Sequence, residues 1–189
     1  FTQFSTREIG LSDERVMSLA QQGEILWVGT MTGGINLLRE QTVISTLSHN
    51  NEIPSSVSSN AISRIYEDHS GNIWICTYGG GVNKYLGDGR FERFPNILNS
   101  DGQFPVLFTL DIVEGQNGLM WIATDGGGVV VLDPETGSTR MIQYDSKNST
   151  SLGSNNVTSL LVVDNVIWIG TRDNGLNLYD ISSGEIRHK

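Results

Sequence analysis

A tryptophan recurs at a fixed interval along this chain, and that interval constrains the fold more than any other feature of the sequence. Trp27, Trp74, Trp121 and Trp168 are each separated from the next by 47 residues. A fixed period of about 20–50 residues is the signature of a repeat architecture, in which each repeat is one supersecondary unit. The 189-residue chain therefore contains four repeats.

The same short pattern surrounds every tryptophan. An apolar residue precedes it, and a β-branched residue, a small residue and a threonine follow it, which is typical of a short buried strand. Four residues after the threonine stands a glycine preceded by Gly or Asn, and this pair predicts a tight turn with positive φ. The threonine hydroxyl is expected to bond to the backbone of that turn. The threonines are Thr30, Thr77, Thr124 and Thr171, and the glycines are Gly34, Gly81, Gly128 and Gly175.

Each repeat has room for four short strands, and no segment has helical periodicity. Four strands per repeat with this period predict an all-β protein of about four four-stranded antiparallel β-propeller blades. The small residue near each tryptophan predicts that a neighbouring sheet packs closely there, with the indole between the sheets. The predicted blades are residues 15–47, 61–95, 106–144 and 156–188, and residues 1–6 are predicted to be the outer strand of a preceding blade.

Four blades are at the lower limit for a closed propeller, so the chain is expected to be a fragment of a larger one. Exposed blade edges then favour a homodimer or other self-association through those edges.

Composition excludes several classes of partner. The net charge is −9 and no block of Lys and Arg occurs, which argues against nucleic-acid binding. No apolar run reaches the roughly 18 residues of a membrane span, and no signal peptide is visible, so no direct membrane contact is expected from this segment. The single cysteine, Cys76, excludes an intrachain disulfide and stands at the small-residue position, which predicts a buried, inert thiol.

No catalytic set, metal site or cofactor site is predicted. The three histidines lack metal-ligand spacing and are expected at the surface. The two triple-glycine runs join strand to strand and offer no helix N-terminus for a phosphate. Three carboxylates share the third repeat, but nothing in the sequence pairs them for acid–base work. These residues are His49, His69, His188, Gly79–Gly81, Gly126–Gly128, Asp111, Glu114 and Asp125.

Two segments, Val57–Tyr85 and Gly153–Tyr179, resemble the two-component regulator propeller repeat. The resemblance lies in a Ser/Asn lead-in, a D-x-x-G turn, W-I-x-T and a Gly-Gly-hydrophobic run, and it extends in weaker form over all four repeats. It implies the periplasmic sensor region of a hybrid two-component system of the Bacteroidetes type. In that family the propellers sense glycan fragments, and the histidine kinase and regulator domains lie elsewhere in the chain.

The positions directly after the conserved threonines are the predicted ligand-binding positions. Four repeats place four different side chains there, namely Met31, Tyr78, Asp125 and Arg172. In a propeller these turns open on one face, around the central channel, where an aromatic ring, a carboxylate and a guanidinium could bind a sugar by stacking and bidentate hydrogen bonds. Arg64, on a predicted innermost strand, is a further candidate. The alternative interpretation is that these side chains are solvated turn residues.

The sequence is compatible with three functions. The first is a non-catalytic, extracytoplasmic sensor segment whose ligand is a glycan-derived oligosaccharide and whose signal passes to a kinase domain absent from these residues. The second is a structural propeller that mediates receptor dimerisation without direct ligand binding. The third is a propeller enzyme, which would need clustered His, Glu and Tyr or paired carboxylates on the channel face.

Overall fold

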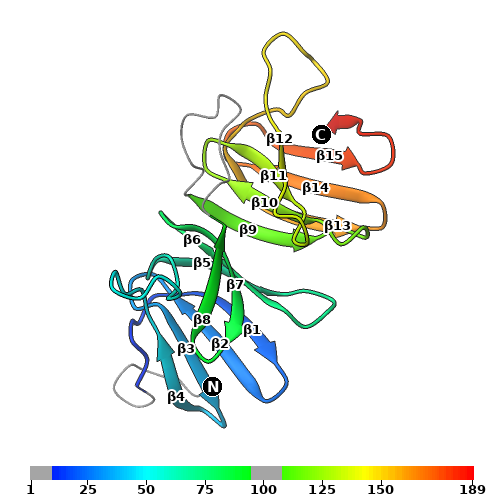
Figure 1. The fold of residues 1–189 in the computed structure, drawn as a ribbon. Coiled ribbons are helices and arrows are strands. Elements are labelled where there is room, and N and C mark those ends of the chain that lie inside the picture. The colour runs from blue at the N-terminus through cyan, green and yellow to red at the C-terminus, as the bar shows by residue number, and fades with distance from the viewer. Residues whose placement is uncertain (1–9, 95–107) are drawn as a thin grey trace. The chain divides into compact units, whose positions relative to one another are not determined.

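A computed structural model describes residues 10–94 and 108–189, and these residues form four four-stranded antiparallel sheets with no helix among them (Figure 1). The chain divides into two compact units, Phe1–Pro95 and Asn96–Lys189, each of which holds two of the sheets. The all-β prediction is confirmed. Residues 1–6, predicted to be an outer strand, lie outside the described residues.

Every sheet is a meander in which sequential strands pair. Sheet 1 is β1 (Val16–Gln22), β2 (Ile25–Thr30), β3 (Ile35–Arg39) and β4 (Thr42–Leu47), and sheet 2 is β5 (Ile62–Glu67), β6 (Ile73–Thr77), β7 (Gly81–Gly87) and β8 (Arg90–Phe94). Sheet 3 is β9 (Thr109–Glu114), β10 (Met120–Thr124), β11 (Gly128–Leu132) and β12 (Thr139–Ile142), and sheet 4 is β13 (Val157–Val163), β14 (Val166–Thr171), β15 (Leu176–Asp180) and β16 (Ile186–His188).

A tryptophan lies between the two sheets of each unit. In unit 1 the Trp27 indole, on β2, packs with Ile62, Ile65 and Ile75 of sheet 2. Its ring meets that of Tyr85 edge-on, with the centroids 4.9 Å apart. Aromatic pairs in this arrangement add about 0.5–1.5 kcal/mol to the free energy gained from burial.

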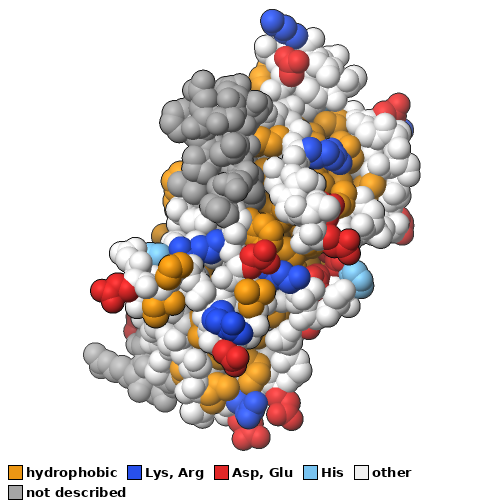
Figure 2. All heavy atoms as spheres, in the orientation of Figure 1, with side chains coloured by type: hydrophobic (Ala, Val, Ile, Leu, Met, Phe, Trp, Pro, Cys, Tyr) orange, Lys and Arg blue, Asp and Glu red, His pale blue; other side chains and the backbone are white. Residues whose placement is uncertain are grey.

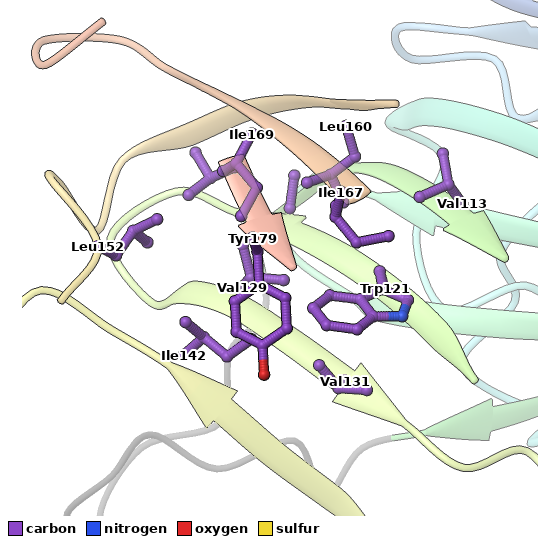
Figure 3. Close-up of a cluster of buried hydrophobic side chains, with 12 residues drawn as sticks. Val113, Trp121, Val129, Val131, Ile142, Leu152, Leu160, Ile167, Ile169 and Tyr179 are labelled. Atoms are coloured by element: carbon purple, nitrogen blue, oxygen red, sulfur yellow. The ribbon is translucent and has the colours of Figure 1, made fainter. Parts of the chain in front are cut away.

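Unit 2 repeats this arrangement. Trp121, on β10, packs against Leu160, Ile167 and Ile169 of sheet 4, and its ring centroid lies 5.0 Å from that of Tyr179 (Figure 3). Tyr179 stands 94 residues after Tyr85, two full repeats along the chain. The predicted tryptophan layer between neighbouring sheets is therefore confirmed within both units.

The fourth tryptophan is placed differently. Alternate residues of a strand face opposite sides of its sheet. Ile167 and Ile169 face sheet 3, so Trp168 faces the other side, and its side chain is half-buried rather than buried. Within the described part of unit 2 no sheet packs on that side.

The conserved threonines close the turns, as the sequence predicted. Each hydroxyl donates a hydrogen bond to the carbonyl oxygen of the glycine four residues later. The four oxygen–oxygen distances, from Thr30, Thr77, Thr124 and Thr171 in that order, are 2.9, 2.8, 2.7 and 2.9 Å.

The turn glycines correct one expectation. The φ angles of Gly34, Gly81, Gly128 and Gly175 lie between 62° and 78°, but the preceding residues do not have positive φ. At Gly33 and Gly80 the reason for glycine is close packing, because a Cβ there would collide with Ser12 and Ser58 respectively. Close approach of a side chain, and not backbone conformation, therefore selects the first glycine of the pair.

The same serines bond to buried asparagines. Asn36 Nδ2 donates to Ser12 Oγ and Asn83 Nδ2 donates to Ser58 Oγ, both at 2.8 Å. In sheet 4 the corresponding asparagine is Asn177, whose Oδ1 accepts from the Gly153 amide at 2.9 Å. Gly153 has no hydroxyl, and the buried Nδ2 of Asn177 has no partner. Asn174 stands where the serine-containing repeats have glycine. A Cβ at Gly153 would lie 3.1 Å from Asn174 Oδ1, so a serine at position 153 would be crowded by this asparagine.

The fourth repeat has Gly153 and Asn174 where the first two have a serine and a glycine, and this exchange of residues predicts that substitutions at the two positions are coupled. The double variant Gly153→Ser/Asn174→Gly should unfold at higher urea concentration, with a gain of about 1 kcal/mol, because it gives the Asn177 amide the acceptor that it lacks. Gly153→Ser alone should gain less, because Asn174 crowds the new side chain. The measurement is a double-mutant cycle, and a coupling energy near zero would contradict the exchange.

The connections between sheets contribute to the core. The segments Ser48–Ala61 and Gln143–Asn156 are mostly polar, but each carries one fully buried apolar side chain, Val57 and Leu152 respectively. Val57 belongs to the core of unit 1 and Leu152 to that of unit 2 (Figure 3). These connections are therefore anchored and are not merely polar loops.

The turn before Trp74 has a carboxylate at its centre. Asp68 Oδ2 accepts from the Trp74 indole at 2.9 Å and Oδ1 accepts from the Asn72 amide at 2.8 Å. Burial alone would raise the pKa of Asp68, but the hydrogen bonds from Trp74 and Asn72 outweigh it and hold the pKa below its ordinary value.

This lowered pKa predicts an acid sensitivity. A carboxylate with a depressed pKa in the folded state stabilises the fold above its unfolded-state pKa, and this stabilisation is lost as the pH falls through the folded-state value. Asp68→Asn should therefore lower the unfolding free energy at pH 7, and the difference from the parent chain should shrink below about pH 4. Trp74→Phe removes the indole donor but keeps most of the ring. This variant should begin to lose stability at a higher pH than the parent chain as the solution is acidified. A pH-independent difference for Asp68→Asn would contradict this role.

Candidate functional site

The four predicted ligand-binding positions share one main-chain hydrogen bond. The amide of the residue after each conserved threonine donates to the carbonyl oxygen of the residue immediately before the innermost strand of the same sheet. The bonds are Met31 to Arg15, Tyr78 to Ala61, Asp125 to Phe108 and Arg172 to Asn156, at 2.8–3.0 Å. The four positions thus share this main-chain bond, while their side chains differ.

In unit 2 the structure brings two of these side chains together. Arg172 Nη1 lies 3.1 Å from Asp125 Oδ1, and Arg172 Nη2 lies 3.3 Å from Asp125 Oδ2. This is a bidentate guanidinium–carboxylate pair, whose geometry fixes the orientation of both groups. The partners are separated by one repeat of 47 residues, so equivalent turns of adjacent sheets meet.

The pair keeps donors available for a ligand. A guanidinium has five N–H donors, and Asp125 engages two of them. The Arg172 side chain is 55% exposed, whereas that of Asp125 is only 20% exposed. The carboxylate therefore orients the guanidinium, and the guanidinium presents its remaining donors to solvent, where they can bond to hydroxyl or carboxylate oxygens.

Two neighbouring residues complete this cluster. Asn156 forms an isolated β-bridge with Asp125, and its side-chain amide donates to Asp173 Oδ2 at 3.0 Å. Hydrogen bonds from the Ser154 hydroxyl and the Asn156 amide hold the pKa of Asp173 below its ordinary value. We call Asp125, Asn156, Arg172 and Asp173 the turn cluster; it combines two acidic side chains with one guanidinium.

The other predicted positions belong to unit 1 and are not part of the turn cluster. Met31 and Tyr78 are 44% and 50% exposed. Arg64 lies on β5 opposite Cys76 and is half-buried. Its position corresponds to Ser18 of β1, which pairs with Gly29, and to Asp111 of β9, which pairs with Ala123.

Those corresponding positions have a structural role. Ser18 Oγ accepts from the Ile65 amide and Asp111 Oδ2 from the Leu160 amide, both at 2.9 Å. Each bond links the innermost strands of the two sheets in one unit. The Asp111 carboxylate is therefore used to hold sheet 4 against sheet 3.

On the face in Figure 2, acidic and basic side chains are interspersed, and no continuous patch of Lys and Arg is visible. Among the described residues, no group of three or more His, Cys, Asp or Glu is placed to hold a metal ion. The described ranges also contain no helix long and apolar enough to span a membrane.

Meandering four-stranded sheets that pack on one another through a buried aromatic layer are β-propeller blades. Residues 56–79, which lie in the second repeat, match the family model described as two component regulator propeller. The match covers the Ser56–Val57 anchor, β5, the Asp68 turn and β6.

Solved structures agree on the fold. The extracellular domain of the putative hybrid two component system BT4673 from B. thetaiotaomicron aligns with 100% of this chain at a TM-score of 0.79 and 23% identity. That of BT3049 from the same organism aligns with 95% of it at a TM-score of 0.72 and 26% identity. PorZ of Porphyromonas gingivalis, a surface component of the type-IX secretion system, aligns with 88% at a TM-score of 0.65 and 16% identity.

This chain spans about a quarter of the length of those structures, covering 27%, 23% and 24% of them respectively. No curated protein matches the chain.

Proposed function

We propose that the chain is a non-catalytic sensor segment of a hybrid two-component receptor, located outside the cytoplasm. Support comes from the family match at residues 56–79 and from the likeness, at 26% identity, to the extracellular domain of a putative hybrid two component system. In this proposal the signal passes to a histidine kinase domain elsewhere in the receptor.

We further propose a glycan-derived oligosaccharide as the ligand. The observation that carries this step is the turn cluster, in which Asp125 fixes a guanidinium that remains 55% exposed. Orientation by a carboxylate lowers the entropy lost when the donors bind a ligand. A fixed fork of donors beside acidic acceptors suits the vicinal hydroxyls of a sugar, each of which both donates and accepts.

Isothermal titration of the chain with a panel of glycan oligomers tests the proposal. Arg172→Ala should weaken any binding by about 10-fold or more, the loss expected for a hydrogen bond to a charged group. Arg187→Ala is the matched control, because Arg187 is also exposed and ion-paired, at 3.8 Å from Glu185, but lies outside the turn cluster. Equal weakening by both variants would contradict a role for the cluster.

Sedimentation separates this proposal from a structural role in dimerisation. Exposed apolar side chains on β1, namely Val16, Met17 and Leu19, are 42–58% exposed and favour self-association of unit 1. A concentration-dependent dimer that no oligosaccharide affects, together with absence of sugar binding, would favour the structural role.

A further inference from the structure

Unit 2 contains a polar cavity that is distinct from the turn cluster. It has a volume of about 280 Å³, is open to solvent, and lies between the connection that leads into β13, the turn at Asn174 and the end of β16. Typical sites for drug-sized ligands occupy about 300–1,000 Å³, so this cavity suits one group of side-chain size rather than an oligosaccharide. Its lining includes Tyr144, Asp145, Ser151, Leu152 and His188.

The connection in unit 1 is built in the same way, which allows a direct comparison. Ser56 Oγ accepts from the Asn50 amide and donates to the Asn50 carbonyl oxygen, both at 3.0 Å. Ser151 makes the same two bonds with Asp145, at 2.9 and 3.1 Å. The residue two positions after each serine donates its amide to a buried asparagine at 2.9 Å. The two connections therefore present the same backbone groups at the same places.

In unit 1 a guanidinium occupies the place of the cavity. Arg93, on β8, donates from Nε to the Ser56 carbonyl oxygen at 2.9 Å and from Nη2 to Ser56 Oγ at 3.0 Å. A longer bond of 3.4 Å joins Nη2 to the Val57 carbonyl oxygen. Unit 1 thus shows which chemistry these acceptors select: a planar, charged group with several donors and no acceptor.

In unit 2 the corresponding side chain is too short to make these bonds. Arg93 pairs with Asn83 across the outer strands of sheet 2, and His188 pairs with Asn177 at the same register of sheet 4. No described residue donates to the Ser151 carbonyl oxygen, and the Leu152 carbonyl oxygen receives a bond of 3.4 Å from the Ser151 hydroxyl. The acceptors that Arg93 engages in unit 1 are therefore available to an external donor in unit 2.

A second difference between the units places a negative charge beside the cavity, which suits a guanidinium. Where unit 1 has the neutral Asn50, unit 2 has Asp145, whose exposed side chain lines the cavity. Tyr144, 49% exposed, adds an aromatic ring to the lining, and guanidinium groups stack favourably on such rings. The unit that lacks an internal arginine thus has an additional carboxylate and an aromatic surface in its place.

We propose that this cavity binds the arginine side chain of a peptide or protein partner. The guanidinium donates to the Ser151 and Leu152 carbonyl oxygens and to Ser151 Oγ, as Arg93 does in unit 1, while Asp145 supplies the opposite charge. This site is independent of the turn cluster and of any oligosaccharide bound there.

Titration of the chain with N-acetyl-arginine amide, followed by amide chemical shifts in NMR, tests the proposal. Saturable shifts should be centred on residues 151–153, and the citrulline analogue, which has nearly the same shape but no charge, should bind at least tenfold more weakly. Asp145→Asn should weaken binding several-fold. Asn is tolerated there because unit 1 has Asn50 at the corresponding position.

The decisive variant is His188→Arg, which supplies the internal guanidinium that unit 1 already has. It should abolish binding of the arginine probe, whereas the control His188→Gln, which leaves the cavity open, should retain it. Equal binding of arginine and citrulline analogues, undiminished binding to the His188→Arg variant, or no saturable shift at residues 151–153 would each overturn the proposal. Because His188 lies outside the turn cluster, His188→Arg should leave any sugar binding unchanged, so failure of this proposal is distinguishable from failure of the proposed sensor function.

Discussion

Trp121→Ala should lower the unfolding free energy of unit 2 by about 3–5 kcal/mol, the range measured for large-to-small substitutions of buried aromatic residues. The indole is fully buried, packs with Leu160, Ile167 and Ile169, and contacts the Tyr179 ring. Its removal leaves a cavity between sheets 3 and 4 that neither sheet can fill. Since small domains are stable by about 5–15 kcal/mol, the variant should show a strongly lowered urea midpoint for this unit.

The matched control is Trp168→Ala, the same substitution at the equivalent position one repeat later. Trp168 is half-buried and faces away from sheet 3. Its loss should cost about 1–2 kcal/mol, because less apolar surface returns to water. Near-equal losses for the two variants, measured on the 189-residue chain, would show that the indole between the sheets has no special part in holding them together.

Leu152→Ala should cost about 2–4 kcal/mol, although the residue lies outside every strand. Its side chain is fully buried in the core of unit 2, and it enters from a connection that is otherwise mostly polar. The substitution removes an apolar contact and loosens the connection that carries Asn156. Unfolding in urea measures the first effect, and amide hydrogen exchange at residues 145–156 measures the second.

Ser149→Ala is the control for Leu152, because Ser149 is exposed in the same connection. Surface substitutions away from special features usually stay within about 0.5 kcal/mol. A small effect at both positions would mean that the connection is held by its hydrogen bonds alone and that Leu152 is dispensable.

Much of the fold could be predicted because the same residue pattern recurs in four repeats. The repeated tryptophan predicted the layer between sheets, and the threonine and glycine predicted the bonded turns; both predictions are confirmed. The buried apolar anchors were missed because each is a single residue in a run of Ser, Asn and Gly or Pro. Such a run carries no periodicity, and only the three-dimensional course of the chain turns that residue inward.

The candidate site was predictable in position but not in its contacts. Asp125 and Arg172 were singled out because they differ at a repeated position, yet nothing local to either indicates that they pair. One signal was present in retrospect: opposite charges one full repeat apart belong to equivalent turns of adjacent sheets. The Arg93 and His188 difference gave no such signal, since it depends on the register of the outer strands.

The bonds that hold the four turns have a consequence for how recognition can change. The bond from the threonine hydroxyl and the main-chain bond of the next residue recur in all four turns, and neither uses the side chain that follows the threonine. Methionine, tyrosine, aspartate and arginine all occur there with the same main-chain bond, although the residue that follows has positive φ only in the second and third turns, at Gly79 and Gly126. In the proposed sensor, single substitutions at these four positions would therefore change the ligand that is bound while both recurring bonds and the fold are kept.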